Sequence, residues 1–340
     1  MDGGGRRSSI LETGTPTSVG SLPHLQSGEA VALVLRVQPE LPTLPQLPGR
    51  SVLESMLPQV AVGMGGVVVE PDGGLSVSPG RVCPVEDGAP LDEGAWATLD
   101  AFLDAASTVP RLKAVKVQLA GPVTLALALV HGGVAPGRAF AAAGATVRSR
   151  ARALAAEVRR RLPGVGIVAV LDEPGLTAFL APGFPAGVDA TIDLMSGALV
   201  AFGADVVTGI HCCGPTDWRL VIHAGPDLIS LPVDAGITDD SSGLTAFLER
   251  GGWIAWGAVP TDRPIGEKED PHWRGLSTLW CDLARAGCDP GLLRTQALVT
   301  PACGLAGHGS HQVEQVLRLT RRVAERVQDQ AIAARLSAGA

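Results

Sequence analysis

The sequence lacks the features that mark several large classes of protein. Its 340 residues carry a formal net charge of −7 and no extended run of Lys and Arg, so a surface for nucleic acid or for an anionic membrane is not expected. No apolar stretch is long and uninterrupted enough to cross a bilayer. The glycine-rich turns are not followed by Gly-Lys-Ser/Thr, which excludes a phosphate loop of that type. We therefore predict neither nucleic acid nor a membrane as a partner.

Cysteine is sparse, with six residues, and the N-terminal basic pair Arg6-Arg7 has no apolar segment behind it. We therefore expect no secretory leader and a cytoplasmic location, where thiols serve metals and chemistry more often than disulfides. A composition of 46% hydrophobic and 18% charged residues argues against disorder. The length suits one α/β barrel of about 250 residues with insertions.

Eight short apolar runs, separated by segments with helical spacing, predict an α/β fold, a single (β/α)8 TIM barrel. A doubly wound sheet is the alternative, but it would not bring the ends of its first, fourth, fifth and eighth strands around one pocket. We expect the barrel over residues 15–330, between flexible tails at 1–14 and 331–340. The expected strands are 17–22, 65–69, 114–119, 166–171, 206–210, 228–231, 253–256 and 293–299.

The proline-rich stretch Leu41–Pro48 is expected to lie outside the sheet, because proline lacks the N–H that a strand ladder needs. It is suited either to a linker or to a rigid wall beside a pocket. A closing helix is predicted from His311 to about Gln328.

Thiol and imidazole side chains follow two of the expected strands. His211 and Cys213 come directly after one, and their spacing on an extended segment sends both to the same face. Cys303 follows the last strand, and the C-terminal strand ends of a barrel meet around one site. Imidazole nitrogen and thiolate sulfur are zinc ligands. An isolated cysteine more often fills a core, but the three together predict a zinc site at this face.

Five segments occur in the order found in the C-terminal catalytic barrel of cobalamin-independent methionine synthase. The sequence resembles that barrel over roughly residues 15–328, in a wider family that includes uroporphyrinogen decarboxylase and corrinoid-linked thiol methyltransferases. The resemblance implies a (β/α)8 barrel that binds zinc and transfers a methyl group to homocysteine, forming methionine. The five segments are Val19–Pro23, Leu119–Thr124, Leu171–Pro174, His211–Cys213 and Pro301–Leu305.

The resemblance also assigns roles to residues. It implies that the zinc ligands are His211, Cys213 and Cys303. It likens Asp172 to the carboxylate that binds the amino group of homocysteine, and Gly20-Ser21 to the segment that holds its carboxylate. The alternative for Asp172 is a structural ion pair at a strand end.

Glu70 is a further candidate for the amino group, with an exposed turn carboxylate as the favoured alternative.

Three departures from the family pattern concern the remaining site residues. Pro232 stands where the family has a glutamate ligand, so Asp234 is the candidate fourth zinc ligand. In place of the family's histidine after the seventh strand, the loop offers Asp262 as a proton donor, with His272 nearby. The resemblance does not extend to an N-terminal barrel, which leaves the methyl donor open: a methyl-folate, a methyl-corrinoid protein or another donor.

We therefore predict a thiol methyltransferase with zinc as its cofactor and small molecules as its substrates. One alternative is a corrinoid-linked enzyme with a different thiol acceptor. Another is a degenerate barrel that binds a thiol or zinc without catalysis. A metal-free decarboxylase is less favoured, since it would leave the His and Cys set without a purpose.

Overall fold

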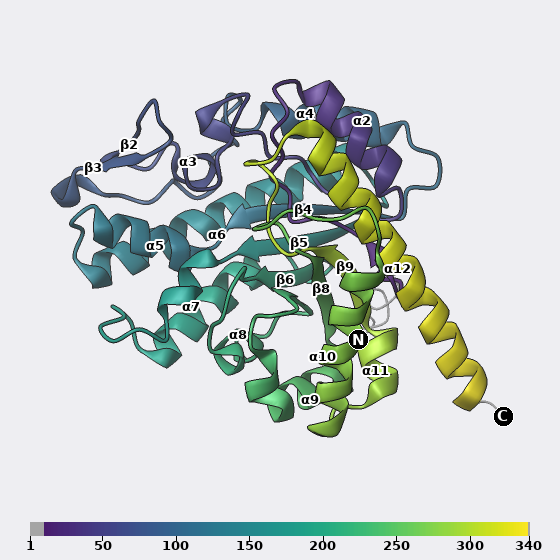
Figure 1. The fold of residues 1–340 in the computed structure, drawn as a ribbon. Helices are drawn as coiled ribbons and strands as arrows, with labels where there is room; N and C mark the ends of the chain where they lie inside the picture. The colour runs from purple at the N-terminus through teal and green to yellow at the C-terminus, as the bar shows by residue number, and fades with distance from the viewer. Residues whose placement is uncertain (1–9, 339–340) are drawn as a thin grey trace.

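A curled sheet of seven parallel strands forms the centre of the protein, which a computed structural model describes over residues 10–338 (Figure 1). The order β1-β9-β8-β7-β6-β5-β4 follows the chain except for β1, which pairs with the last strand, as in a TIM-type barrel. The strands are β1 (Thr15–Pro16), β4 (Ala114–Ala120), β5 (Gly166–Asp172), β6 (Val207–His211), β7 (Leu228–Pro232), β8 (Trp253–Val259) and β9 (Ala297–Pro301).

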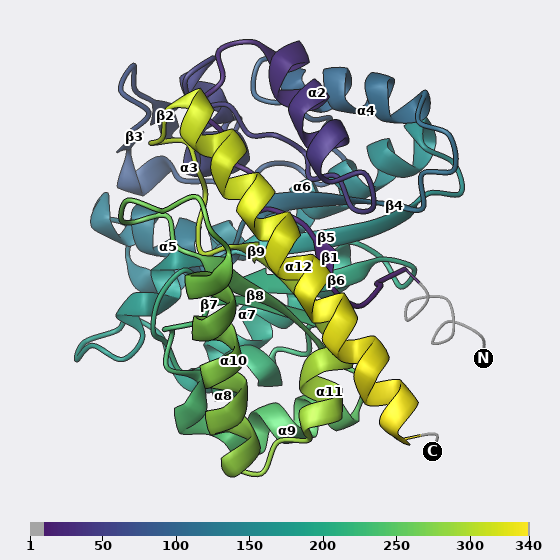
Figure 2. The ribbon, with the colours of Figure 1, turned by 45° about the vertical axis from the view of Figure 1, so that its right-hand side comes forward.

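Helices surround this sheet on its outer side (Figure 2). They are α2 (Ser27–Val37), α3 (Met56–Ala61), α4 (Ala97–Ser107), α5 (Pro122–His131), α6 (Pro136–Arg161), α7 (Val188–Ala201), α8 (Trp218–His223), α9 (Ser241–Glu249), α10 (Asp270–Arg285), α11 (Pro290–Thr295) and α12 (Ser310–Ala338). The long α12 crosses β1 and β9 on the outside (Figure 2). Within residues 10–338, no helix combines the length and the apolar character that a membrane span requires.

The proline-rich stretch Leu41–Pro48 joins the two edges of the sheet, so the expectation that it lies outside was wrong. Its Leu44 N–H donates to the carbonyl of Lys116 on β4 at 2.8 Å, and the Lys116 N–H donates to the carbonyl of Pro42 at 2.9 Å. On the other side, Gln46 exchanges two backbone hydrogen bonds with the continuation of β1, at Gly20 and Leu22. The prolines are tolerated because Leu44 and Gln46 supply the N–H groups that these bridges use.

The run expected as the second barrel strand instead forms a hairpin outside the main sheet. Strands β2 (Val67–Val69) and β3 (Leu75–Val77) pair only with each other, antiparallel (Figure 1). Val68 is 62% exposed, so this valine run is not a buried strand. Glycine pairs at 65–66 and 73–74 flank the hairpin, and Gly66 and Gly73 have φ of 69° and 85°, which favours turns at both ends.

Three boundaries also differ from expectation. The first strand, expected over residues 17–22, is β1 at Thr15–Pro16, and its continuation adds an isolated bridge at Ser21. The last strand begins at Ala297 and not near Leu293, because Asp289 caps α11 by accepting hydrogen bonds from the N–H groups of Gly291 and Leu292. The closing helix runs on to Ala338. Of the expected tails, residues 1–9 and 339–340 lie outside the described residues.

Side chains inside the barrel change from apolar to polar along the strands. Toward the N-terminal strand ends they form an apolar cluster that includes Ala114, Val168, Val170, Val207, Leu228, Ala255 and Leu298. Asp172 and His211 end β5 and β6 and are paired with each other, and His211 is paired in turn with Ser230 in the middle of β7. All three are buried. Because side chains alternate with a period of two, the same alternation that builds the apolar floor directs these polar groups into the barrel.

Candidate functional site

His211 ends β6 with one ring nitrogen bonded and the other free. Its Nδ1 lies 3.0 Å from Oγ of Ser230 on the neighbouring strand β7. Its Nε2 is buried and has no hydrogen-bond partner among residues 10–338. A buried polar atom without a partner is unfavourable, so Nε2 is a candidate to bind a ligand or a metal ion.

Cys213 and Cys303 lie side by side beside this imidazole. A hydrogen bond from the Cys303 thiol lowers the pKa of Cys213, whereas donating that bond raises the pKa of Cys303 to about 12. The His211 ring, which lies close to Cys303, opposes the rise in the pKa of this thiol. The structure thus brings together the three residues expected to bind zinc. Both cysteines are partly exposed, in contrast to Cys212, which is buried in the core.

Asp172 lies in the same row of the barrel and carries a second unpartnered atom. Its Oδ1 is buried and has no hydrogen-bond partner among the described residues. Burial raises the pKa of Asp172 to about 7, and the charge of Lys116 opposes this rise. Lys116 donates from Nζ to the Val19 carbonyl at 2.9 Å, and burial lowers its pKa to about 8.

The next residue, Glu173, has a structural role. Its carboxylate accepts hydrogen bonds from the N–H groups of Val123 and Thr124 at 2.8 and 2.7 Å and from the Thr124 hydroxyl at 2.6 Å. It thereby satisfies free donors at the first turn of α5. Its pKa is raised to about 7, with burial as the largest cause. Of the two adjacent carboxylates, only Asp172 lines a cavity at the site.

Two cavities meet at the thiol pair. A smaller one of about 330 Å³ holds Asp172 and His211, and a larger one of about 730 Å³ holds Asp234 and Asp262; Cys213 and Cys303 line both. The smaller cavity is also lined by Val19, Ser21, Gln46, Pro48, Ser55, Met56, Pro174, Gly304, Ala306 and Gly307. The proline-rich stretch is therefore a wall of this cavity, as one of the two expectations for it stated.

Ser21 is fixed in the smaller cavity by a close approach of two loops. Its backbone carbonyl accepts a hydrogen bond from Leu305 N at 2.8 Å. A Cβ added at Gly304 would lie 2.0 Å from Ser21 Oγ, so the two loops approach closely at this point. Gly20, which precedes Ser21, has φ of 142°, and a Cβ there would lie 2.2 Å from Gln118. Gly304 thus allows the Cys303 loop to pack against Ser21, and Gly20 allows the same segment to pack against Gln118 of β4.

The other predicted site residues lie further out. Asp234 and Asp262 are 67% and 73% exposed, and each lies 3.9 Å from the Arg263 guanidinium at the rim of the larger cavity. Glu70 belongs to the β2–β3 hairpin region and lines neither cavity. The structure therefore groups Asp234 and Asp262 with the thiols in one cavity and does not bring Glu70 there.

Two histidines of the larger cavity received little weight from the sequence. His272 Nε2 and His308 Nδ1 are buried and have no hydrogen-bond partner within residues 10–338. Burial and the charge of Arg263 lower the pKa of His272. His308 follows Cys303 by five residues in the sequence and lines the same cavity.

Ser230, Lys116 and Met56 were missed entirely. The sequence could have indicated Ser230 and Lys116, because they are polar residues at inward positions of otherwise apolar strands.

The donor set fits a zinc ion chemically, although it is not preformed in geometry. Two thiols and an imidazole nitrogen without a partner are soft ligands of the kind zinc takes. Across residues 10–338, however, no group of three or more His, Cys, Asp or Glu side chains stands in an arrangement that could hold a metal ion as it is. A zinc ion could therefore be bound by this set only if the side chains moved toward one another.

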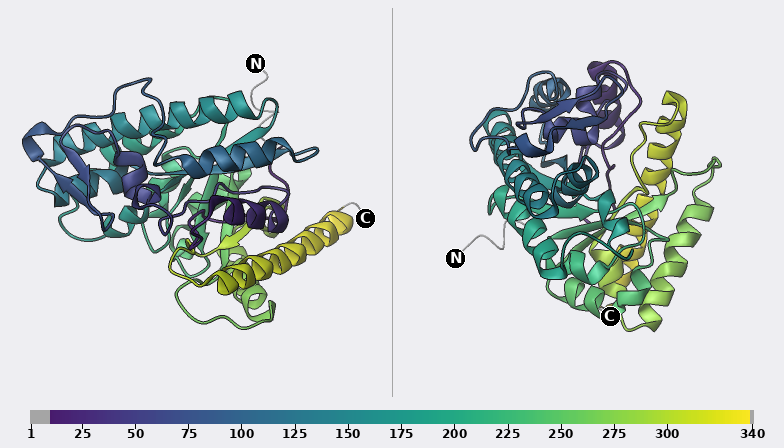
Figure 3. Two further views of the ribbon diagram at one scale, coloured as in Figure 1. Left: turned by 90° about the horizontal axis from the view of Figure 1, so that it is seen from above. Right: turned by 90° about the vertical axis from the view of Figure 1, so that its left-hand side faces the viewer.

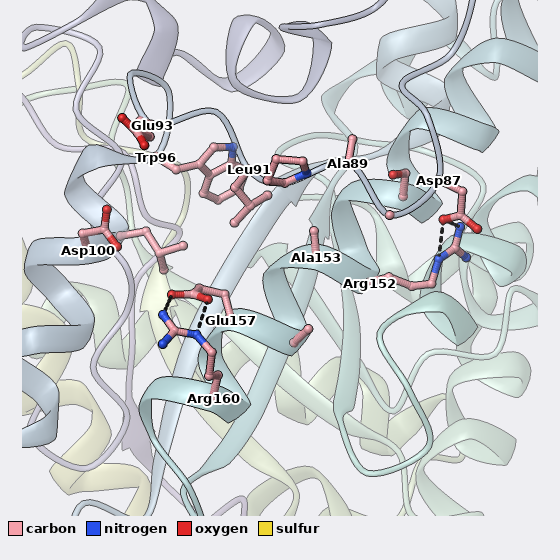
Figure 4. A pocket seen from close by; sticks show the side chains of 15 residues that line it. Asp87, Ala89, Leu91, Glu93, Trp96, Asp100, Arg152, Ala153, Glu157 and Arg160 are labelled. Carbon is pink, nitrogen blue, oxygen red and sulfur yellow. Dashed lines mark hydrogen bonds and ion pairs between the residues drawn. The ribbon is translucent and has the colours of Figure 1, made fainter.

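A separate hollow of about 680 Å³ lies on the outer surface, away from this chemistry (Figure 4). It is formed by the loop before α4 and by α6, with Leu91 and Trp96 on one side and Ala153 on the other. Ion pairs Arg152–Asp87 and Arg160–Glu157 lie along it. It contains no thiol or imidazole, so the barrel mouth remains the candidate site.

The parallel sheet and its outer helices define a TIM-type α/β protein (Figure 3). Its cluster of thiol and imidazole side chains lies at the C-terminal strand ends. Among solved structures, the chain is similar to a B12-independent methionine synthase from Shewanella sp. W3-18-1, determined in complex with selenomethionine. The two share 16% sequence identity and a TM-score of 0.63, over 94% of this chain and 99% of that one. No family model and no curated protein matches the sequence. The protein therefore shares its fold with this synthase, as the motifs predicted.

Proposed function

We propose that this protein is a zinc-dependent methyltransferase that transfers a methyl group to the thiol of homocysteine and forms methionine. The observation that supports this proposal is the meeting of two cavities at Cys213 and Cys303, beside the free Nε2 of His211. A thiol acceptor in one cavity and a methyl donor in the other would face each other across the pair. The fold shared with a methionine synthase is consistent with this assignment.

The residues that would hold zinc are His211, through Nε2, and Cys213 and Cys303, through their sulfur atoms. Three protein ligands leave a position for the substrate thiol, as in other catalytic zinc sites. Zinc bound here would lower the pKa of that thiol, so that the sulfur is a thiolate and a stronger nucleophile. Asp234 is the proposed fourth ligand in the absence of substrate, because it lines the same cavity as both thiols.

In the smaller cavity, Asp172 is placed to bind the ammonium group of the amino acid. Its Oδ1 is unpartnered and buried, and an arriving cation would satisfy it and favour its ionised form. Ser21 lines the same cavity as Asp172, and the Gly20-Ser21 segment is assigned to the substrate carboxylate. These contacts orient the thiol toward Cys213 and Cys303, and such orientation is itself a large part of catalysis.

The transfer is a displacement at carbon. The acceptor sulfur, having lost its proton, forms a bond to the methyl carbon, while the bond from the methyl group to the donor breaks and its electron pair remains with the donor. Where that leaving group needs a proton, Asp262 and His272 line the donor side and are the candidates to supply it. The proposed donors remain a methyl-folate or a methyl-corrinoid protein.

The zinc content of the protein and the number of sulfur neighbours around the zinc ion together test this function. The purified protein is analysed for zinc, and X-ray absorption at the zinc edge is recorded with and without homocysteine. One zinc per chain, with one more sulfur neighbour after homocysteine is added, supports the proposal. Methionine formation is then measured with methyl-folate and with methylcobalamin as donors. Zinc binding without turnover of any donor would instead favour a non-catalytic binding barrel, which the exposed positions of Asp234 and Asp262 also permit.

A further inference from the structure

The hydroxyl of Ser230 on β7 forms a hydrogen bond with the His211 ring, and this bond determines which ring nitrogen faces the cavity. Ser230 sits in the middle of β7, and its side chain points into the barrel with that of Leu228, whereas Ile229 and Leu231 pack outward against the helices. His211 and Ser230 are paired in the register of adjacent parallel strands. The bond between Nδ1 and Oγ, 3.0 Å long and buried, is thus fixed by the sheet itself.

The two ring nitrogens have different environments, and this difference selects a tautomer. If the proton is on Nδ1, it is donated to Ser230 Oγ, and Nε2 presents a lone pair to Cys303 and the cavity. If the proton were on Nε2, its N–H would be buried without a hydrogen-bond partner among residues 10–338, close only to the sulfur of Cys303, a weak acceptor, and this tautomer is less favourable. A neutral imidazole that presents its Nε2 lone pair is the form that binds a metal.

We propose that Ser230 is a positioning residue that holds His211 in the metal-binding tautomer and orientation. This inference rests on the proposed function, because it concerns the zinc site of the same enzyme. Ser230 itself lines neither cavity, so it acts on substrate and metal only through the imidazole. Its backbone carbonyl also accepts the Cys212 N–H at 3.1 Å; that bond does not depend on the side chain, so a side-chain change leaves the strand pairing intact.

Zinc affinity of three variants tests the proposal. Ser230→Ala removes the hydroxyl, Ser230→Thr keeps it, and Thr208→Ala removes a buried hydroxyl from β6 that bonds to Asp227 and not to an imidazole. Zinc affinity is measured by competition with a chelator, and thermal unfolding of the metal-free proteins is recorded in parallel. We expect Ser230→Ala to bind zinc about 10- to 100-fold more weakly, the effect typical of a lost outer hydrogen-bond partner. Ser230→Thr and Thr208→Ala should stay within a few-fold of the original protein.

The outcomes separate this inference from the proposed function. If Ser230→Ala binds zinc as tightly as the original protein, or if Ser230→Thr is as weak as Ser230→Ala, the positioning role is overturned while the zinc enzyme stands. If the original protein binds no zinc, both the proposed function and this role fail. If Ser230→Ala is unstable without metal, the comparison of Ser230→Thr with Thr208→Ala still decides. A loss of zinc affinity in the threonine variant alone contradicts the proposal, and retention in both supports it.

Discussion

Asp172 and His211 occupy paired positions on the neighbouring strands β5 and β6, and each directs one unpartnered polar atom into the barrel. The pairing places a carboxylate oxygen and an imidazole nitrogen on the wall of one cavity. An acceptor that carries both an ammonium group and a thiol could bind the Asp172 oxygen directly through the ammonium group. Its thiol could reach the His211 nitrogen through a metal ion bound by both. The predictions below separate these two contributions.

Asp172→Asn should weaken the binding of homocysteine without removing zinc. Loss of a hydrogen bond between charged groups costs about 1.5–3 kcal/mol, so KM for homocysteine should rise about 10- to 100-fold. The control is 4-mercaptobutyrate, which has the thiol and carboxylate but no amino group, and which both proteins should use equally. An unchanged KM for homocysteine would remove Asp172 from the amine-binding role.

Cys213→Ser and Cys303→Ser should each abolish stoichiometric zinc binding. A ligand loss is expected to weaken zinc by more than the roughly 100-fold that loss of an outer partner costs. Cys281→Ser is the matched control, because Cys281 is an exposed thiol on α10 away from both cavities. Elemental analysis after dialysis gives the result; full zinc in either of the first two variants contradicts the ligand set.

Gly304→Ala should impair substrate binding more than stability. The new Cβ would collide with Ser21 Oγ, and rotation of that hydroxyl relieves most of the clash, so the free energy of unfolding should fall by only about 1 kcal/mol. The displaced hydroxyl no longer faces the cavity, and KM for homocysteine should increase.

Gly309→Ala is the control for this prediction, because nothing lies within 4 Å of a Cβ at Gly309. A Ser21→Gly change combined with Gly304→Ala should recover the lost stability without recovering KM. Equal KM values for Gly304→Ala and Gly309→Ala would show that the Ser21 hydroxyl does not contact the substrate.

Lys116 should make the protein more stable as the pH rises from about 8 to 10.5. Burial lowers its pKa from 10.5 to about 8 in the folded state. In this window the unfolded chain therefore binds more protons than the folded one, and stability increases with pH. Relative to the original protein, Lys116→Met should lose this rise, which we expect to be about 2 kcal/mol.

Urea unfolding at several pH values measures the difference, and the absence of tyrosine keeps other alkaline titrations few. Lys113→Met is the control, since Lys113 is 69% exposed. Parallel pH profiles for Lys116→Met and the original protein would contradict the prediction.

The sequence predicted six of the barrel strands well because each is a continuous, almost fully buried run, and polar residues follow or end several of them. Strands β4 to β9 are of this kind, and Asp172, His211 and Cys303 mark three of their ends. The same rule failed for Val67–Val69, because an apolar run of three in a hairpin has the same local pattern as a buried strand. It failed in the opposite direction for Leu41–Pro48, where the bridges need N–H groups at only two positions.

The division of the site into two cavities was beyond sequence reasoning. Which side of Cys213 and Cys303 faces Asp172, and which faces Asp262, depends on how loops of different strands fold over the barrel mouth. The contact of Ser230 with His211 likewise depends on the register of two strands whose sequences are separated by a helix. Spacing in the sequence indicates which polar side chains point into the barrel, but it does not indicate which other side chains they contact there.

The proline-rich stretch closes the barrel with fewer hydrogen bonds than the strands do. Only two isolated bridges connect it to the sheet edges in the described structure, whereas the other strand pairs form continuous ladders. Hydrogen exchange should therefore report the fastest local opening at Leu44 and Gln46. Because Gln46 and Pro48 also line the smaller cavity, each opening would widen the space next to Asp172. Local opening at this least stable part of the barrel would then provide the route by which an amino acid enters the cavity and its methylated product leaves.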